Sequence, residues 1–152
     1  VPMDSPSPRD LKPKKKAPPS PRRDGREAAV QFLYGNEAQG TAAVTPETLA
    51  AFWELRDAKP AVRKFAEELI RGVTAHSEEI DSAIRTQLEN YSLQRLTAVD
   101  RNILRLGTYE ILFSGHIPPQ AAINEAIEIA KRFGTEESPR FVNGILDRIL
   151  KR

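Results

Sequence analysis

Residues 122–148 contain two apolar stripes at helical spacing, separated by a short polar hinge. The apolar positions of the two stripes are Ile123, Ala126, Ile127, Ala130, Val142, Ile145, Leu146 and Ile149. Charged residues fall between them, so each segment presents one apolar face and one solvated face. Two amphipathic segments joined by so short a hinge predict an antiparallel helical hairpin.

The hinge carries its own stop and start signals. Gly134 is placed to end the first helix in a left-handed conformation, which glycine adopts without strain. Ser138 is expected to supply an N-cap oxygen for the second helix, and Pro139 suits the first helical turn because its missing N–H costs nothing there.

Five further segments combine a capping or breaking residue with an apolar stripe. The expected caps are Asp24, Thr45, Ser77 and Thr97, and the remaining segment, after Pro60, carries Phe65, Leu69, Ile70 and Val73. No stretch alternates at period two over a length that predicts a strand. The chain is therefore expected to be all-α, with about seven helices. The segment 97–113 is apolar nearly all round, which predicts that it forms the central, most buried helix.

The basic character of the chain is concentrated at its N-terminal end. Residues 1–26 hold eight Lys and Arg against three Asp, whereas the remaining residues hold fifteen basic and eighteen acidic residues. Seven of the twelve prolines precede residue 22. Such a segment buries too little apolar surface to offset its ordering entropy, so residues 1–21 are predicted to form a disordered basic arm, followed by one helical domain over residues 22–152.

Several function classes lack support in the sequence. The chain has no Cys, and its two histidines, His76 and His116, show no ligand spacing, so we expect neither a metal nor a cofactor. No Gly-rich phosphate loop and no nucleophile elbow is present, so we do not expect an enzyme. No apolar run reaches the ~18 residues of a membrane span, and no secretory signal is visible, so we expect a cytoplasmic protein without membrane contact.

The arginines at the end of the basic arm are the first candidates for a binding site. Arg22, Arg23 and Arg26 stand at the start of the first predicted helix, where cations oppose the helix dipole. Arg22 and Arg26 are four residues apart and so share a face, on which guanidinium groups can bind phosphates. The alternative is a solvated helix start without function. Their position against the dipole favours the functional interpretation.

The sequence resembles the NusB family of bacterial transcription antitermination factors in three blocks that occur in the family's order. The blocks are Arg26-Glu27-Ala28-Ala29-Val30-Gln31-Phe32-Leu33-Tyr34, Asp100-Arg101-Asn102-Ile103-Leu104-Arg105-Leu106-Gly107-Thr108-Tyr109-Glu110, and the hairpin motifs 123–131 and 141–147. The resemblance implies a fold of two packed helical subdomains. It also implies that the protein binds boxA single-stranded RNA, using the basic first helix and the C-terminal helices, and helps RNA polymerase to read through terminators during ribosomal RNA synthesis.

The resemblance adds aromatic and polar candidates for RNA binding. Unstacked bases need flat side chains, and Tyr34 and Phe141 are the candidates, although their residue patterns alone favour a place in the core. Arg140 and Asn143 flank Phe141 at the start of the last helix, where free N–H groups favour a phosphate, and ordinary solvated polar residues are the alternative. Lys131 is a further possible RNA contact.

The resemblance also implies a protein partner, the ribosomal protein that acts as the transcription factor NusE. Asp100 matches an acidic position of the family and is the candidate on the partner side, with a helix-capping role beside Thr97 as the alternative. Glu136 and Glu137 in the hinge should repel a phosphate passing nearby. The sequence does not distinguish a monomer from a homodimer.

Two other functions stay open at this point. A NusB-like domain also precedes the catalytic domain of a family of ribosomal RNA cytosine methyltransferases. The chain ends directly after its last predicted helix, which leads us to expect the antitermination factor rather than the methyltransferase. A helix-turn-helix DNA binder would use Arg140 and Asn143 in its recognition helix, but the acidic hinge fits it poorly.

Overall fold

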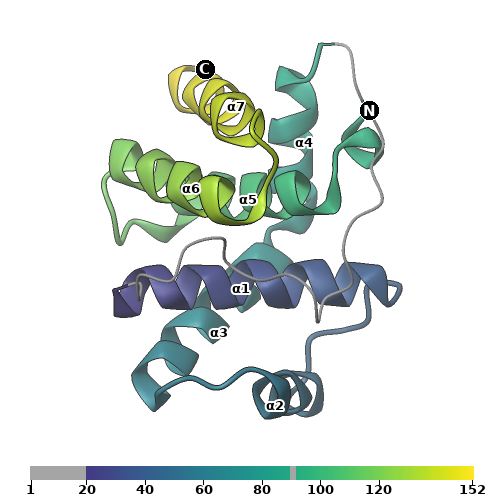
Figure 1. Ribbon diagram of the computed structural model, residues 1–152. Helices are drawn as coiled ribbons and strands as arrows, with labels where there is room; N and C mark the ends of the chain where they lie inside the picture. The colour runs from purple at the N-terminus through teal and green to yellow at the C-terminus, as the bar shows by residue number, and fades with distance from the viewer. Residues whose placement is uncertain (1–19, 90–91) are drawn as a thin grey trace.

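The computed structural model describes residues 20–89 and 92–152, and this part of the chain holds seven α-helices and no strand (Figure 1). The α-helices are α1 (Pro21–Ala38), α2 (Pro46–Leu55), α3 (Pro60–Ala75), α4 (Ser77–Gln87), α5 (Ala98–Tyr109), α6 (Pro119–Phe133) and α7 (Ser138–Lys151). A 3₁₀ turn, η2 (Leu93–Arg95), precedes α5, and a π-helical turn, η3 (Glu110–Ser114), follows it. The all-α prediction is confirmed, whereas nearly all of the predicted arm lies outside the described residues.

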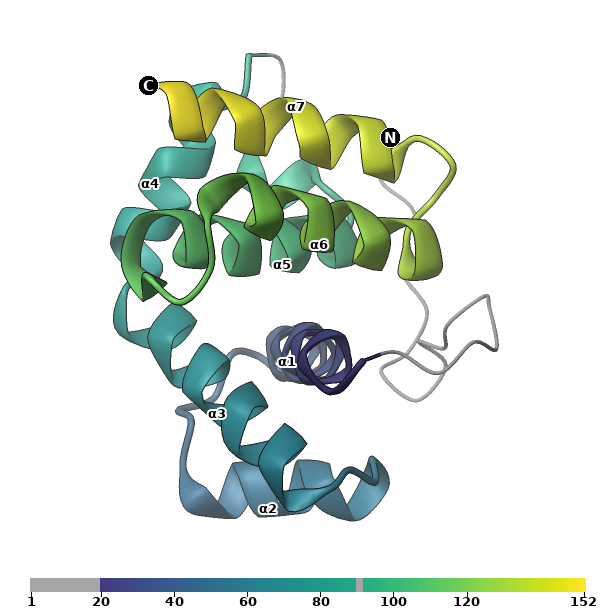
Figure 2. The same cartoon turned by 90° about the vertical axis from the view of Figure 1, so that its left-hand side faces the viewer.

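The helices form two packed groups. Helices α1, α2 and α3 make one group, and α4 to α7 make the other, with α1 lying between α3 and the upper helices (Figure 2). Helix α5 contacts α1, α3, α4, α6 and α7, so the prediction of a central helix from the apolar segment 97–113 is confirmed. Its side chains Ile103 and Leu104 are almost completely buried in the main core.

The starts of α1 and α4 differ from the sequence predictions. The Ser20 hydroxyl caps α1 by accepting a hydrogen bond from the Arg23 N–H at 3.2 Å, whereas the predicted cap Asp24 lies inside the helix. His76, rather than Ser77, occupies the N-cap position of α4. Thr45 and Thr97 cap α2 and α5 as predicted, because each side chain accepts a hydrogen bond from the N–H three residues on.

The hinge between α6 and α7 also differs from its prediction. Gly134 has φ −90° and ψ −169°, so it is extended rather than left-handed. A Cβ at Gly134 would clash with the Ser138 side chain, and this close approach explains the glycine. Ser138 is the first residue of α7 rather than its N-cap. Its hydroxyl instead accepts a hydrogen bond from the Thr135 N–H at 2.9 Å and so holds the hinge together.

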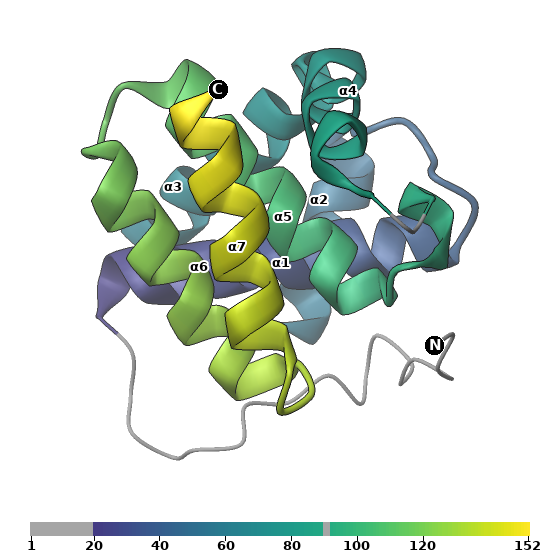
Figure 3. The same ribbon diagram turned by 90° about the horizontal axis from the view of Figure 1, so that it is seen from above.

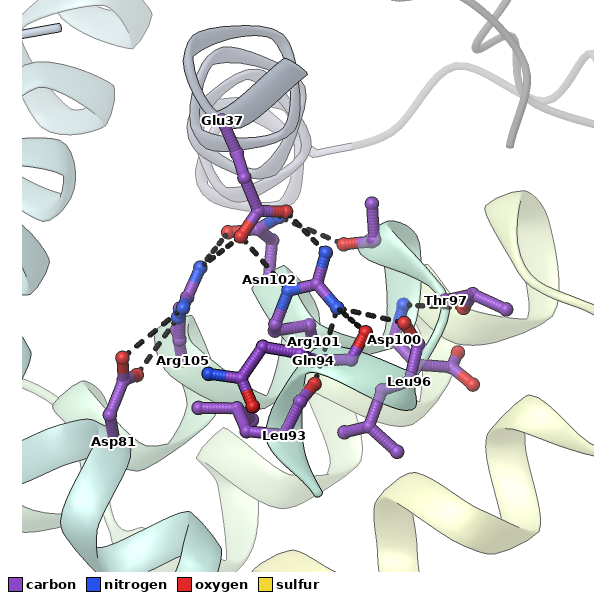
Figure 4. A network of polar contacts seen from close by, with 11 residues as sticks. Glu37, Asp81, Leu93, Gln94, Leu96, Thr97, Asp100, Arg101, Asn102 and Arg105 are labelled. Atoms are coloured by element: carbon purple, nitrogen blue, oxygen red, sulfur yellow. Dashed lines mark hydrogen bonds and ion pairs between the residues drawn. The ribbon is translucent and has the colours of Figure 1, made fainter. Parts of the chain in front are cut away.

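A network of charged side chains joins the two helix groups (Figure 4). Glu37 of α1 accepts hydrogen bonds from Arg101 at 2.6 and 2.9 Å and from Arg105 at 2.8 Å. Arg105 also donates to Asp81 of α4 at 2.9 and 3.1 Å. Burial acts to raise the pKa of Glu37, but the hydrogen bonds and charges of the two arginines outweigh it and lower that pKa.

The described helices are too short or too polar for any of them to cross a membrane. The hairpin of α6 and α7 packs against α5 with its buried positions facing inward, and Figure 3 shows α6 and α7 side by side. This arrangement places the N-terminal end of α7 at the surface.

Candidate nucleic-acid interface

The first turns of α1 are fixed to α6 by two ion pairs. Arg23 makes a two-point contact with Glu125, Nε to Oε1 at 3.0 Å and Nη2 to Oε2 at 3.1 Å. One turn further on, Arg132 donates to Glu27 at 2.7 Å, and Glu27 is almost completely buried. Since Arg23 is still one-third exposed, its outer edge stays available to solvent. The start of α1 is therefore anchored, and its orientation is set by α6.

Arg26 is buried, which makes the prediction of an exposed face shared by Arg22 and Arg26 wrong. Its residue is only 4% exposed, and its guanidinium donates to both carboxylate oxygens of Glu110 at 2.7 and 2.9 Å. Glu110 begins the π-helical turn after α5 and is itself buried. A guanidinium fully used inside the protein has no edge for a phosphate, so Arg26 serves the fold.

Arg22 has the opposite placement. It is exposed, and among the described residues it makes no ion pair. Its Cζ atom lies 4.5 Å above the centroid of the Phe65 ring of α3, a cation–π contact that orients the guanidinium plane. Within the described part of the chain, the N–H groups of Arg22 are therefore available to an anion.

The two aromatic candidates differ in their burial. Tyr34 is 2% exposed and belongs to the main core, so its ring offers no face to a base, and the structural alternative is confirmed. Phe141 is half-buried against the same core at the start of α7. Arg140 and Asn143, on either side of it in sequence, are exposed, and Arg140 has no ion-pair partner in the described part of the chain.

The remaining candidates, Lys131 and Asp100, take part in an ion pair and in a helix-start hydrogen bond. Lys131 is exposed but its Nζ lies 3.0 Å from the Glu128 carboxylate, which weakens its charge toward a phosphate. The Asp100 N–H donates to the Thr97 hydroxyl at 3.2 Å, so this helix-start hydrogen bond is present. Burial raises the pKa of Asp100, against the hydroxyls of Ser138 and Thr97, which act to lower it. A partner contact for Asp100 stays a prediction.

Helix α6 connects the two candidate regions, because it packs against α7 and pairs with α1 through Arg23 and Arg132. Figure 2 shows the N-terminal end of α1 turned toward the viewer, with α6 and α7 above it. The exposed residues Arg22, Arg140 and Asn143, with half-buried Phe141, are the candidate RNA surface. Among residues 20–89 and 92–152, no cluster of His, Cys, Asp and Glu is suited to a metal ion.

The sequence reasoning missed the carboxylates that occupy the arginines of α1. Glu110 lies 84 residues from Arg26 and Glu125 lies 102 residues from Arg23, and no local spacing reveals such pairs. Phe65 was assigned to the apolar stripe of its helix, and nothing in that stripe indicates that Arg22 stacks on the ring.

Comparisons with known proteins agree with the fold. The sequence model of the NusB family matches residues 23–151. The transcription antitermination protein NusB of Geobacter sulfurreducens is 50% identical over 129 residues, which cover 84% of this chain and 92% of the relative. The corresponding protein of Myxococcus xanthus is 45% identical over 132 residues, covering 84% of this chain and 93% of its own.

Solved structures show the same likeness. NusB from T. maritima has a TM-score of 0.77 at 44% identity, covering 88% of this chain and 92% of that chain. A chain in the crystal structure of antitermination factors NusB and NusE in complex with dsRNA has a TM-score of 0.77 at 31% identity, covering 86% of this chain and 96% of that chain.

Proposed function

This chain belongs to the NusB family, and on that premise we propose that it is a transcription antitermination factor that binds boxA-type single-stranded RNA together with a NusE-like ribosomal protein. A relative of known structure was solved with NusE and with double-stranded RNA, which supports a NusE-like partner and RNA as the class of ligand. The protein would act in the cytoplasm as part of an RNA polymerase complex that reads through terminators during ribosomal RNA synthesis.

The RNA-binding proposal rests on a difference between the arginines near α1 and α7, of which some are held in ion pairs and others are exposed. Arg26 and Arg132 are held in buried or nearly buried ion pairs, whereas Arg22 and Arg140 are exposed and make no ion pair among the described residues. Exposed arginines can bind phosphates in a two-point geometry. Phe141 and Asn143 beside Arg140 supply a partly open ring for stacking and an amide for hydrogen bonding to a base.

The chain is proposed to act by binding alone. Its candidate surface holds arginines, an amide and an aromatic ring, which recognise RNA but provide no nucleophile with an adjacent base. The curated relatives are named as transcription antitermination proteins, and the match covers 92% of the Geobacter sulfurreducens protein. These relatives favour an antitermination factor over the RNA-binding domain of a methyltransferase.

The test is binding of the full chain to three labelled RNAs of equal length: a boxA-like single strand, a scrambled single strand and a duplex. Fluorescence anisotropy is measured with and without the NusE-like ribosomal protein, at several salt concentrations. We expect the tightest binding to the boxA-like strand and a further gain when the partner is present. Equal binding to the two single strands with no effect of the partner would refute the proposal, and preference for the duplex would change the ligand class.

A further inference from the structure

The start of α3 carries basic residues that the fold leaves unused. Lys59 and Lys64 are exposed, and neither makes an ion pair within residues 20–89 and 92–152. Arg63 reaches the Asp57 carboxylate only at 3.7 Å, and both side chains are well exposed. The first turn of α3 holds no acidic residue, although the helix dipole favours one there. The Arg63 Nε also donates to the Ala58 carbonyl at 2.9 Å, so of these cations only Lys59 and Lys64 have no evident role in stabilising the helix.

The same residues lie beside the start of α1. Lys59 and Pro21 line one shallow surface pocket of about 350 Å³, together with the carboxylates Asp24 and Asp57. Arg22 stacks on Phe65, one residue beyond Lys64, and Figures 1 and 2 show the N-terminal end of α1 lying over α3. The start of α3 is thus continuous with the candidate RNA surface.

Neighbouring carboxylates offset only part of this positive charge. Asp24 is held by Arg56 at 2.6 Å, whereas Asp57 is fully exposed and lies 3.7 Å from Arg63. Glu68, four residues beyond Lys64 on the same face of α3, is exposed and offsets part of the Lys64 charge.

We propose that the RNA path continues from α1 onto the first two turns of α3, where Lys59 and Lys64 bind backbone phosphates and the Arg22 guanidinium, stacked on Phe65, binds a base. This inference rests on the proposed RNA-binding function and adds a second contact region to it. An ammonium group binds a phosphate as a point charge, and a guanidinium plane supported by a ring leaves its other face open for a nucleobase. Non-specific charge attraction would need no such stack.

The main test removes the two lysines. The double variant Lys59→Ala, Lys64→Ala and a matched control, Arg85→Ala, Arg95→Ala, each lose two exposed cations that make no described ion pair, and α4 with η2 lies away from the start of α3. For a single strand, each lost phosphate contact lowers the slope of log K against log salt by about 0.7. We expect the lysine variant to lose about 1.4 from the slope and the control to keep the wild-type slope. Equal slopes for wild type and the lysine variant would overturn the proposal.

A series of shortened RNAs tests the path itself. RNA affinity of wild type and of the lysine variant is compared while the boxA-like strand is shortened from its 5′ end or from its 3′ end. Shortening from one of the two ends should make the two affinities equal, because it removes the nucleotides that reach α3. If the affinities still differ after shortening from each end in turn, an extended path is contradicted. If the wild type binds no RNA, the proposed function fails; if Arg140→Ala weakens binding and the lysine variant does not, only this extension fails.

A third variant addresses the stack. Phe65→Leu keeps an apolar side chain near Gly25, against which the Phe65 ring packs, but removes the ring under Arg22. We expect RNA affinity to fall severalfold with an unchanged salt slope, because no charge is lost. Unchanged affinity for a folded Phe65→Leu protein would remove Arg22 and Phe65 from the proposed base contact.

Discussion

Arg26 and Glu110 form a two-point ion pair in the interior, with N–O distances of 2.7 and 2.9 Å and side chains exposed by only 5% and 2%. The pair connects α1 to the π-helical turn that follows α5. It therefore lies at the junction of the two helix groups, four residues from Arg22, which points to solvent. Two arginines of one helix turn thus serve different purposes.

Replacing Arg26 by Ala should destabilise the protein by about 3–5 kcal/mol, because it leaves the buried Glu110 carboxylate without its partner. The free energy of unfolding, measured by urea denaturation, checks this. Arg22→Ala is the matched control and should cost less than about 1 kcal/mol, the value of an exposed cation–π contact. Equal losses for the two variants would contradict the assigned roles.

Two glycines of the C-terminal hairpin should respond in opposite directions to Ala. Gly134→Ala should cost about 1–3 kcal/mol, because the new Cβ would clash with the Ser138 side chain. Gly144→Ala should stabilise α7 by about 0.5–1 kcal/mol, because a Cβ there meets no atom within 4 Å and Ala is the better helix former. Thermal unfolding of both variants measures the difference, and a shift in the same direction would disprove the packing argument.

The helices could be predicted from sequence because their apolar residues recur at helical spacing, as in Ile145, Leu146 and Ile149 of α7. The central position of α5 could be predicted in the same way, because a helix that is apolar nearly all round must be covered by other helices on most of its sides. Helix ends were less predictable. Ser20 and Asp24 are both good capping residues, but Ser20 caps α1 and Asp24 pairs instead with Arg56, which follows α2.

The candidate site could be predicted only in part. Spacing correctly placed Arg22 and Arg26 on one side of α1, since both guanidinium groups lie over the Phe65 ring, at 4.5 and 5.3 Å. It could not reveal that Glu110, from a distant segment, would bury one of them. The burial of Tyr34, by contrast, agrees with its residue pattern, which places it beside the apolar stripe of α1.

The Glu37 network should make stability depend on pH in the acidic range. The pKa of Glu37 is lowered from its ordinary value of 4.5, so its stabilising effect is fully present above that value and is lost as the pH falls through the folded-state pKa. The stability difference between wild type and Glu37→Gln should therefore shrink as the pH falls below about 4.5 and further as it falls through the lowered pKa of Glu37. Urea denaturation across this range measures it. A difference that stays constant would show that Glu37 is not held ionised by Arg101 and Arg105.

Neutralising Glu137 should tighten RNA binding at low salt. The carboxylate is exposed at the N-cap position of α7, three residues before Arg140, and repels a phosphate bound there. Glu78→Gln is the control, because Glu78 is also an exposed acid at a helix start, on α4. The affinity gain of Glu137→Gln should disappear at high salt. Identical affinities of Glu137→Gln and wild type at every salt concentration would rule out this repulsion.

The most direct test of the RNA surface is the salt dependence of binding for the double variant Arg22→Ala, Arg140→Ala. Both arginines are exposed and make no ion pair in the described part of the chain, so the fold should be retained. With a boxA-like single strand, the slope of log K against log salt should fall by about 1.4, two contacts at about 0.7 each. The Arg85→Ala, Arg95→Ala control should keep the wild-type slope. A wild-type slope for the Arg22 and Arg140 variant would contradict the account and place the RNA elsewhere.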